Sequence, residues 1–482
     1  MIKSTKNMHT CIFLVGKICI RAYFLDFYCI IMIGKGNNML KRRVYNDLLE
    51  FKTNHENKCL IIDGARQIGK SYIVENIFSK EYDSFLKIDF LEKESNKAIF
   101  DGDIDNDSII QKIKLYYPNF DLIKGNTLLF LDELQECPKA IVALKYLAMN
   151  NDVDVVCSGS SLGLAYKANI SYPVGYVKTI NMYSLDFEEF LWALGVENEL
   201  IENMRSLFNN PNLKKIDDAI FNKMNEYLKQ YLVVGGMPEA VNKFIETNDY
   251  KQTYNVLKRI YHDYVTHIAT YADPDIKIKT QAAYKTITGQ LSKENHKFQY
   301  SFIEKKGTAR KFESSVDWLV NSKIVNKVNN VSSISYPLES FDLNNNFRLY
   351  HSDIGLLIST YDFSIVNSLL NDSFDEQNSN PIIKSAKGGI YEALAADLLF
   401  KKDINDIHFY RNEAGTIEIE FLIENNKYGI IPIEIKAGRG QSKSLTQILK
   451  NNDIKIGYKF SNQKNGKVDK KITLPLFMIM FI

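Results

Sequence analysis

The chain has 482 residues, too many for one ordinary domain, which predicts two to four domains. Hydrophobic residues make up 45% and charged residues 24%, as in soluble globular proteins. The net charge of +2 neither indicates nor excludes a nucleic-acid partner, since local patches matter more than the sum.

The cysteines lack the C-x-x-C spacing of a zinc or redox site, which excludes both on this pattern. They are Cys11, Cys19, Cys29, Cys59, Cys137 and Cys157. A chain of this length builds a core without disulfides, so we expect free thiols in a reducing compartment. The sequence therefore predicts a cytoplasmic protein.

Residues 1–38 contain an apolar stretch, CIFLVGKICIRAYFLDFYCIIMIG, that is interrupted by Lys17, Arg21 and Asp26. A membrane span needs about 20 largely uncharged residues, and charges near its middle are costly, so we expect no membrane association. The basic start is compatible with a signal peptide, although no small-residue cleavage site follows. We favour a third interpretation, a natural start at Met39 with residues 1–38 translated from upstream sequence, because a helical pattern begins directly after Met39.

The stretch CLIIDGARQIGKS joins a short apolar strand to a glycine-rich loop that matches G-x-x-x-x-G-K-[ST] at every fixed position. Such a loop turns its backbone N–H groups toward phosphates, and the following helix adds its dipole. Lys70 would reach the β- and γ-phosphates of ATP, and the Ser71 hydroxyl would bind Mg²⁺. The predicted nucleotide-binding residues are Gly64, Ala65, Arg66, Gln67, Ile68, Gly69, Lys70 and Ser71. For this motif alone, a glycine turn without a ligand is the alternative.

A second motif, NTLLFLDELQECP, favours the nucleotide site. Its apolar run Thr127–Leu131 is too short for a buried helix and predicts a central parallel strand. At the carboxyl end of this strand, Asp132 would hold Mg²⁺ through water, and Glu133 would orient or deprotonate the attacking water. The two motifs together predict an ATP site with Mg²⁺, in which Lys70 and Glu133 are the catalytic residues.

A third apolar run, VDVVCSGSSLG, ends in serines and glycines. Its Ser160 hydroxyl would sense the γ-phosphate, although serine and glycine are equally typical of turns without a ligand. A further strand is predicted in SFLKIDF, and helices near residues 107–117 and 138–149. The alternation of strands and helices predicts an open, mostly parallel sheet with the ligand at the strand ends.

Several motifs are shared with one group of proteins, namely GARQIGKS, LLFLDELQECP, SGSS, YPVGYVKTINMYSLDFEEFLWALG, YLVVGGMPEAV, FRLYHSDIGLL and PIEIKAG. Through them the chain, from about Met39 to its end, resembles bacterial and archaeal AAA+-type ATPases whose C-terminal domain of unknown function is related to PD-(D/E)xK endonucleases. The resemblance implies an α/β P-loop domain, a helical and winged-helix-like middle region and a C-terminal α/β endonuclease-like domain. It also implies an oligomer with a catalytic arginine from a neighbouring subunit, but Tyr176 stands where some relatives carry a basic residue.

The resulting domain boundaries are 1–38 for the extension, 39–200 for the ATPase domain, 201–345 for the middle region and 346–482 for the endonuclease-like domain. In the middle region, two short helical patterns precede a Val-rich strand, as in a helix-turn-helix with a wing. Its basic side chains would either contact a DNA backbone or form a solvated face. They are Lys305, Lys306, Arg310 and Lys311.

The stretch GTIEIEFLIENNKYGIIPIEIKAG predicts a β-hairpin, with alternation through residues 417–423, a turn at 425–426 and a second strand at 430–436. Residues two apart on a strand share a face, which brings Glu418 beside Glu420 and Glu434 beside Lys436. Carboxylates on neighbouring strands could hold Mg²⁺ while the lysine orients a water. The pattern resembles the PD-(D/E)xK core, in which a helix supplies another acid. The candidate nuclease residues are Glu392, Glu420, Glu434 and Lys436, with Glu420 where aspartate is usual.

Two functions follow. The first, which we favour, is a Mg²⁺-dependent ATPase whose hydrolysis repositions the C-terminal domain on a DNA or protein partner. The alternative is an ATP-regulated, metal-dependent DNA nuclease.

Overall fold

The structure is a computed structural model that describes residues 39–54, 56–150, 152–159, 173–211, 214–272, 274–293, 295–371, 381–404, 406–436, 438 and 442–482, together with two short N-terminal strands. The chain divides into two units, Met1–Met39 and Leu40–Ile482. In the first unit, β1 (Leu14–Val15) pairs with β2 (Ile18–Cys19) in antiparallel fashion. No helix in the described ranges has the length and apolar character that a bilayer span requires.

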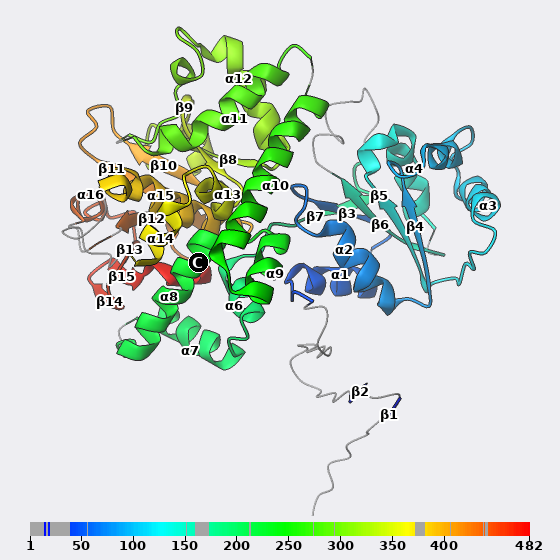
Figure 1. Ribbon diagram of the computed structural model, residues 1–482, viewed down its shortest axis with the longest axis horizontal. Helices are drawn as coiled ribbons and strands as arrows, with labels where there is room; N and C mark the ends of the chain where they lie inside the picture. Colours follow the sequence, from blue (N-terminus) through cyan, green and yellow to red (C-terminus); the bar gives the residue numbers. More distant parts are fainter. Residues whose placement is uncertain are drawn as a thin grey trace, which may run out of the picture. The chain divides into compact units, whose positions relative to one another are not determined.

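The first sheet of the second unit consists of five parallel strands in the order β4-β5-β6-β3-β7 (Figure 1). Its strands are β3 (Cys59–Asp63), β4 (Ser84–Asp89), β5 (Thr127–Asp132), β6 (Asp154–Gly159) and β7 (Val177–Asn181). The helices in this part of the chain are α1 (Val44–Thr53), α2 (Lys70–Asn76), α3 (Asn106–Tyr116) and α4 (Pro138–Ala148), with short 3₁₀ helices η1 (Phe78–Glu81), η2 (Glu94–Phe100) and η3 (Leu134–Glu136). The predicted parallel sheet is confirmed.

The central strands of this sheet are apolar and buried, whereas the edge strands β4 and β7 are partly exposed. Every residue of β3 and β5 is buried, as is usual for central parallel strands. Ile61, Leu129 and Cys157 share one hydrophobic core with residues of α3 and α4. The free thiols Cys59, Cys137 and Cys157 are all buried. The sheet thus provides a rigid base for the loops at its carboxyl edge.

A helical region follows, and its central element is the 22-residue helix α10 (Tyr250–Tyr271). The other helices are α6 (Phe187–Ala193), α7 (Asn198–Asn209), α8 (Asp218–Val234), α9 (Pro238–Thr247), α11 (Lys277–Leu291), α12 (Ala309–Asn321), α13 (Ile354–Ser359) and α14 (Ser364–Asn371), with the 3₁₀ turn η4 (Tyr300–Phe302). Helix α10 packs against α8, α9, α11 and α13. The helical middle region is confirmed, and its winged-helix character stays a prediction.

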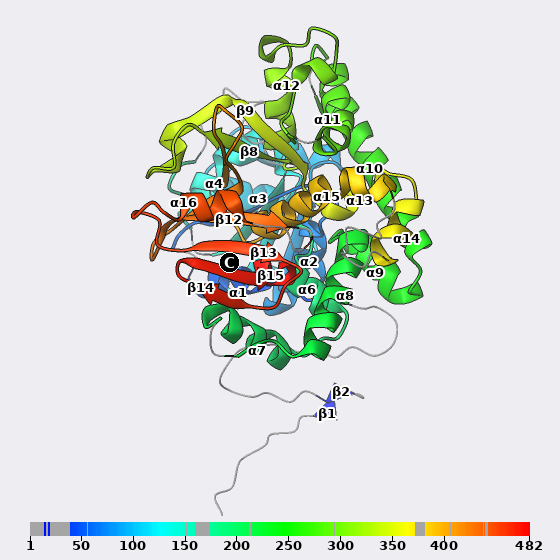
Figure 2. The same cartoon turned by 90° about the vertical axis from the view of Figure 1, so that its left-hand side faces the viewer.

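The second sheet has eight strands in the order β14-β15-β13-β12-β11-β10-β8-β9, and Figure 2 shows β12 to β15 side by side. Its strands are β8 (Val325–Val331), β9 (Asp342–His351), β10 (His408–Arg411), β11 (Glu418–Asn425), β12 (Gly429–Lys436), β13 (Gly457–Ser461), β14 (Gly466–Val468) and β15 (Lys471–Pro475). The remaining helices are η5 (Leu338–Phe341), α15 (Pro381–Phe400), α16 (Lys443–Ile448) and η6 (Leu476–Phe481).

This sheet is mixed, because β11 and β12 pair antiparallel whereas β12, β13 and β15 run parallel. The predicted hairpin is therefore present, and the C-terminal region is α/β. Strand β8 joins the same sheet from within the predicted middle region. The domain boundaries and the endonuclease-like character stay predictions.

Candidate functional site

The phosphate-loop residues 64–69 connect β3 to α2, the strand–loop–helix context that such a motif requires. A Cβ at Gly64 would lie 2.2 Å from the carbonyl oxygen of Met182, so no larger residue fits there without a shift of the backbone. Gly69 has φ +95°, a conformation that glycine adopts without strain. Gln67 is left-handed as well, with φ 60°. The loop thus has the tight, glycine-dependent geometry that the sequence predicts.

Lys70 turns back into this loop. Its Nζ donates hydrogen bonds to the carbonyl oxygens of Gly64 (2.8 Å) and Ala65 (2.6 Å). Burial lowers the pKa of Lys70 to about 8, although Glu133 and Asp63 favour the charged form. The ammonium is therefore held by neutral acceptors that an anion can replace.

Ser71, at the start of α2, meets Asp132, at the end of β5, although β6 lies between β5 and the strand β3 that precedes α2. Ser71 Oγ donates to Asp132 Oδ1 at 3.0 Å, and Ser158 Oγ donates to the same oxygen. Lys87 Nζ on β4 lies 3.0 Å from Asp132 Oδ2. A hydroxyl and a carboxylate are ligands that suit Mg²⁺, so these residues fit the predicted ion.

Ser158 and Lys87 were not predicted from the sequence. Ser158 is the last residue but one of β6, and a hydroxyl near the strand end was a usable signal. The sequence interpretation chose Ser160, which lies outside the described residues. Lys87 lies two residues before the end of β4, and Asp89 of that strand pairs in register with Asp132. The sequence signal for this contact was a lysine within an apolar strand whose neighbouring strand ends in an acidic residue.

Glu133 has φ 54°, an uncommon backbone conformation for a residue with a side chain. Its Oε2 accepts a hydrogen bond from Gln135 Nε2 and lies 3.9 Å from Arg66 Nη2. Glu133 is thus held by one neighbour in its own turn and by one residue of the phosphate loop. Neither restraint was predicted from the sequence.

Helix α10 contacts the phosphate loop directly. The Tyr264 hydroxyl donates to the carbonyl oxygen of Arg66 at 2.7 Å, and Gln67 Nε2 donates to Asp263 Oδ2 at 3.1 Å. The Arg66 guanidinium also lies 4.3 Å from the centroid of the Tyr271 ring. Tyr264 and Arg66 are 198 positions apart in the chain, and no local sequence pattern predicts their contact.

The C-terminal residues form two groups, of which the first surrounds Glu392 on α15. This buried carboxylate accepts hydrogen bonds from Arg348 Nη1 (2.9 Å) and the Tyr350 hydroxyl, and it is hydrogen-bonded to His296 Nδ1 (2.6 Å). Burial alone would raise the pKa of Glu392, but the charges of Arg348 and His296 lower it to about 2. Arg348 also pairs with Glu418. Glu392 is therefore fully engaged by side chains of the protein.

The second group surrounds Lys436 on β12. Its Nζ lies 3.2 Å from Glu420 Oε1 and 3.3 Å from Glu434 Oε1. Burial raises the pKa of Glu420 to about 7, and Glu434 adds to this effect, whereas Lys436 opposes it. Strand pairing thus brings the predicted E-x-K lysine to both hairpin carboxylates.

These two groups do not fit the divalent metal that a PD-(D/E)xK nuclease needs. Within the described ranges, no group of three or more His, Cys, Asp or Glu side chains is arranged to hold a metal ion. Glu392 binds a guanidinium, whereas Glu420 and Glu434 bind an ammonium. The predicted residues lie on the predicted elements, but cations of the protein itself neutralise them.

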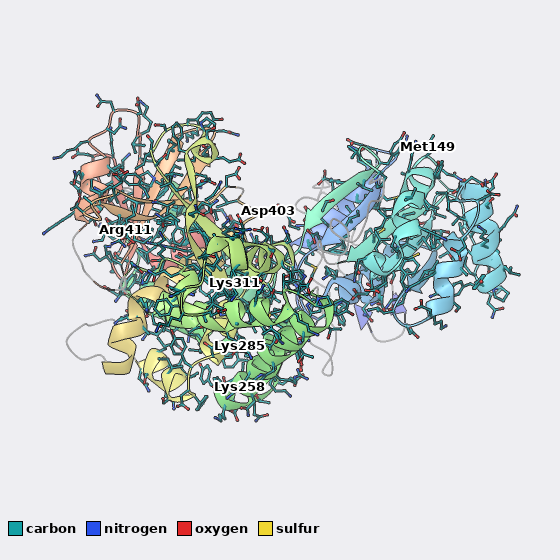
Figure 3. The ribbon with its side chains drawn as sticks, turned by 90° about the horizontal axis from the view of Figure 1, so that it is seen from above. Met149, Lys258, Lys285, Lys311, Asp403 and Arg411 are labelled. Carbon is teal, nitrogen blue, oxygen red and sulfur yellow. The ribbon has the colours of Figure 1, made fainter. Side chains whose placement is uncertain are left out.

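A buried charge cluster around Asp353 connects segments of the second unit that are far apart in the sequence. Its Oδ2 accepts hydrogen bonds from Ser184 Oγ (2.6 Å), Gly236 N (2.8 Å) and Lys401 Nζ (3.0 Å). Lys401 also pairs with Asp397 on α15 at 2.8 Å. Just beyond this helix, Asp403 (labelled in Figure 3) accepts hydrogen bonds from Asn181 and Tyr183, the residues at and after the end of β7.

The predicted basic face of the middle region is exposed to solvent. Its four members, Lys305, Lys306, Arg310 and Lys311, all have exposed side chains. Lys311 on α12 pairs with Glu304 at 2.7 Å, which reduces the charge it can offer to a phosphate backbone. Contact with DNA stays a prediction.

Comparisons with known proteins agree with an ATPase domain in the first part of the chain. Residues 56–191 match a model of an AAA domain, and residues 225–365 and 387–476 match two domains of unknown function, DUF8612 and DUF4143. The AAA match and the P-loop fold together support an AAA-type ATPase domain that binds a nucleotide. A search of curated proteins found no match.

Several solved structures are similar to the chain at low identity. The Walker-type ATPase PABY2304 of Pyrococcus abyssi has a TM-score of 0.40 and 13% identity, over 67% of this chain and 96% of its own. Aeropyrum pernix ORC1 in complex with DNA has a TM-score of 0.30 and 11% identity, over 69% and 92%. PCH-2 of C. elegans has a TM-score of 0.26 and 10% identity, over 44% and 65%. Similarity at this level says nothing about substrates or partners.

Proposed function

We propose that this chain binds ATP with Mg²⁺ and hydrolyses it, and that the nucleotide cycle repositions its C-terminal region on a DNA or protein partner. The observation that carries the proposal is the 3.0 Å hydrogen bond from Ser71 to Asp132. This bond brings Ser71, the last residue of the phosphate-loop motif, next to Asp132 at the end of β5, as a Mg²⁺-nucleotide site requires. The AAA-domain match over residues 56–191 supports it.

Each residue of the site has a proposed role. Lys70 would exchange its two loop carbonyls for oxygens of the β- and γ-phosphates. Ser71 would hold Mg²⁺ directly and Asp132 through water, while bound Mg²⁺ neutralises charge on the phosphates. Glu133 would orient or deprotonate the attacking water. Ser160 is proposed as a γ-phosphate sensor, and an oligomer and a cytoplasmic location stay predictions from the sequence.

The contacts of the phosphate loop support the proposed movement. Two loop residues bond to α10, which packs on α8, α9, α11 and α13. The Asp353 cluster continues this connection to α15 of the C-terminal region through Lys401 and Asp397. A change at the loop would therefore reach the C-terminal region through packed, hydrogen-bonded elements.

The test is ATP hydrolysis by the full chain with Mg²⁺, in the presence and absence of duplex DNA. Lys70→Ala should abolish turnover, and Glu133→Gln should slow it while ATP binding persists. Lys124→Ala, which removes a lysine with a 77% exposed side chain, should leave turnover unchanged. Acceleration by DNA would identify DNA as the partner, whereas Lys70-dependent turnover that ignores DNA would favour a protein. If the parent were no faster than Lys70→Ala, the chain would not be an ATPase by itself.

A metal-dependent DNA nuclease is the second candidate, because β12 places Lys436 between Glu420 and Glu434. This activity would require Glu392 to leave Arg348, since the present arrangement does not fit a metal. It would be measured as nicking of plasmid DNA with Mn²⁺ by the parent and by Lys436→Ala. Equal nicking by both proteins would indicate a contaminant and reject the nuclease.

A further inference from the structure

Arg66 is the cationic side chain of the phosphate loop besides Lys70, at a position that the motif leaves variable. Its guanidinium lies between Glu133 and the end of α10, 3.9 Å from Glu133 Oε2 and 4.3 Å from the centroid of the Tyr271 ring. The side chains of Arg66 and Glu133 are 26% and 28% exposed, so a ligand can reach both. Arg66 therefore touches the proposed catalytic acid and the helical region at once.

The guanidinium of Arg66 has hydrogen-bonding capacity to spare. Its Nε is buried and finds no acceptor in the part of the chain that the structure describes. At 3.9 Å, the contact with Glu133 is an ion pair but too long for a hydrogen bond. A guanidinium has five donors in a planar fork that matches phosphate oxygens. Its position in a phosphate-binding loop makes a nucleotide phosphate the fitting acceptor.

Helix α10 is hydrogen-bonded to Arg66 and to its neighbour Gln67. Tyr264, which is buried, donates to the Arg66 carbonyl, and Asp263 accepts from Gln67. His267 lies one turn before Tyr271, and burial, together with the charges of Arg66 and Lys70, lowers its pKa to about 3. It is therefore neutral at physiological pH and adds no positive charge beside the Arg66 guanidinium.

We propose that Arg66 is a γ-phosphate sensor that acts within its own chain and controls Glu133. Without a γ-phosphate, Arg66 holds Glu133. With ATP in the loop, Arg66 exchanges this carboxylate for an oxygen of the terminal phosphate, which removes one of the two restraints on Glu133 and leaves Gln135 as the other. Because Arg66 also stacks on Tyr271, the same movement signals the nucleotide state to α10. The inference rests on the proposed function, since it requires ATP at this loop.

The first test compares the binding of ADP and of a non-hydrolysable ATP analogue, both with Mg²⁺, to the full chain and to Arg66→Gln. A charge-assisted hydrogen bond to the terminal phosphate predicts that Kd for the ATP analogue rises about tenfold or more, whereas Kd for ADP changes less than about twofold. Gln67→Ala is the matched control, because this neighbour contacts α10 without contacting Glu133. It should shift both dissociation constants to the same extent. Equal weakening of both nucleotides by Arg66→Gln would mean that Arg66 only shapes the loop, and would overturn the proposal.

The second test measures hydrogen exchange of α10 in the two nucleotide states. We expect the exchange of residues 263–271 to differ between the ATP analogue and ADP in the parent and in Tyr271→Phe, which keeps the ring. The difference should disappear in Tyr271→Ala and in Arg66→Gln. If the parent binds both nucleotides through Lys70 but α10 exchanges identically, the sensor is wrong and the ATP site stands. If the parent binds neither nucleotide, the proposed function fails, and the sensor fails with it.

Discussion

The phosphate-loop site and the Glu392 cluster both place acidic side chains beside basic ones, but they satisfy their charges differently. In the loop, Lys70 rests on two backbone carbonyls, and Arg66 lies 3.9 Å from Glu133 with both side chains partly exposed. In the C-terminal region, Arg348 is fully buried, and Glu392 is bonded to Arg348, Tyr350 and His296. The first arrangement can exchange its partners for a ligand, whereas the second is complete without one.

The candidate nuclease carboxylates have cationic partners from the chain itself. Glu420, Glu434 and Lys436 lie together as a nuclease core requires, yet a lysine holds both carboxylates. A buried ion pair is costly to form and costly to break on one side only. We therefore expect substitutions in the loop to change activity and substitutions in the C-terminal cluster to change stability.

The largest expected effect is on turnover at the phosphate loop. Lys70→Met should lower ATP turnover by about 100-fold or more, because it removes a charge that is needed in the transition state. The same change should alter the free energy of unfolding by only about 1 kcal/mol, because burial already disfavours the ammonium and its hydrogen-bond acceptors are uncharged carbonyls. Turnover assays and urea unfolding of the same preparations measure the two effects. A large loss of stability would contradict the view that this site is arranged for exchange.

The next largest effect is on stability in the C-terminal cluster. Arg348→Met should lower the free energy of unfolding by about 3–5 kcal/mol, because Glu392 and Glu418 lose the cation they share. The control is Arg411→Met, since Arg411 (labelled in Figure 3) lies 3.4 Å from Glu418 and its side chain is 34% exposed. That variant should lose no more than about 1 kcal/mol. Urea unfolding measures the loss of unfolding free energy in both variants. Similar losses would show that the burial of Arg348 does not determine its contribution to stability.

Local features of both regions could be predicted from the sequence because they depend on residues close together in the chain. The loop 64–69 connects a strand to a helix, and β11 and β12 form the predicted hairpin. Glycine spacing, apolar runs and strand alternation determine such elements. They also placed Asp132 and Lys436 at the correct strand ends.

The contacts between distant segments could not be predicted in this way. Nothing near Glu392 in the sequence shows that Arg348 neutralises it, and nothing near Arg66 indicates Tyr264 or Tyr271. These contacts depend on how α10, α15 and β9 pack, and no single-sequence period encodes this packing.

A smaller effect is expected in the pH dependence of stability. The pKa of Glu420 is raised from an ordinary value of 4.5 to about 7, chiefly by burial. The folded chain therefore binds this proton more tightly than the unfolded chain, and its contribution to stability is lost as the pH rises from about 4.5 through about 7. Glu420→Gln should remove about 1–2 kcal/mol of the decline in unfolding free energy between pH 5 and pH 8.

The control for this measurement is Glu413→Gln, an exposed residue in the turn between β10 and β11. It should leave the pH profile of urea unfolding unchanged. A profile for Glu420→Gln that ran parallel to that of the parent would show that Glu420 is ionised at neutral pH in the folded chain. Lys436 would then have a larger effect than burial on the pKa of Glu420. Glu420 would be an ionised carboxylate, which is the form that binds a metal.

The smallest difference between the two regions is expected for single hydroxyl groups. Tyr264→Phe removes a neutral hydrogen bond to the Arg66 carbonyl and should lower the free energy of unfolding by about 0.5–1.5 kcal/mol, whereas Tyr350→Phe removes a bond to a buried carboxylate and should cost about 1.5–3 kcal/mol. Urea unfolding of both variants measures this difference. Because Tyr264 holds the loop to α10, its variant should also alter ATP turnover, whereas Tyr350→Phe should not. The reverse pattern would mean that the nucleotide site is coupled to the Glu392 cluster and not to α10.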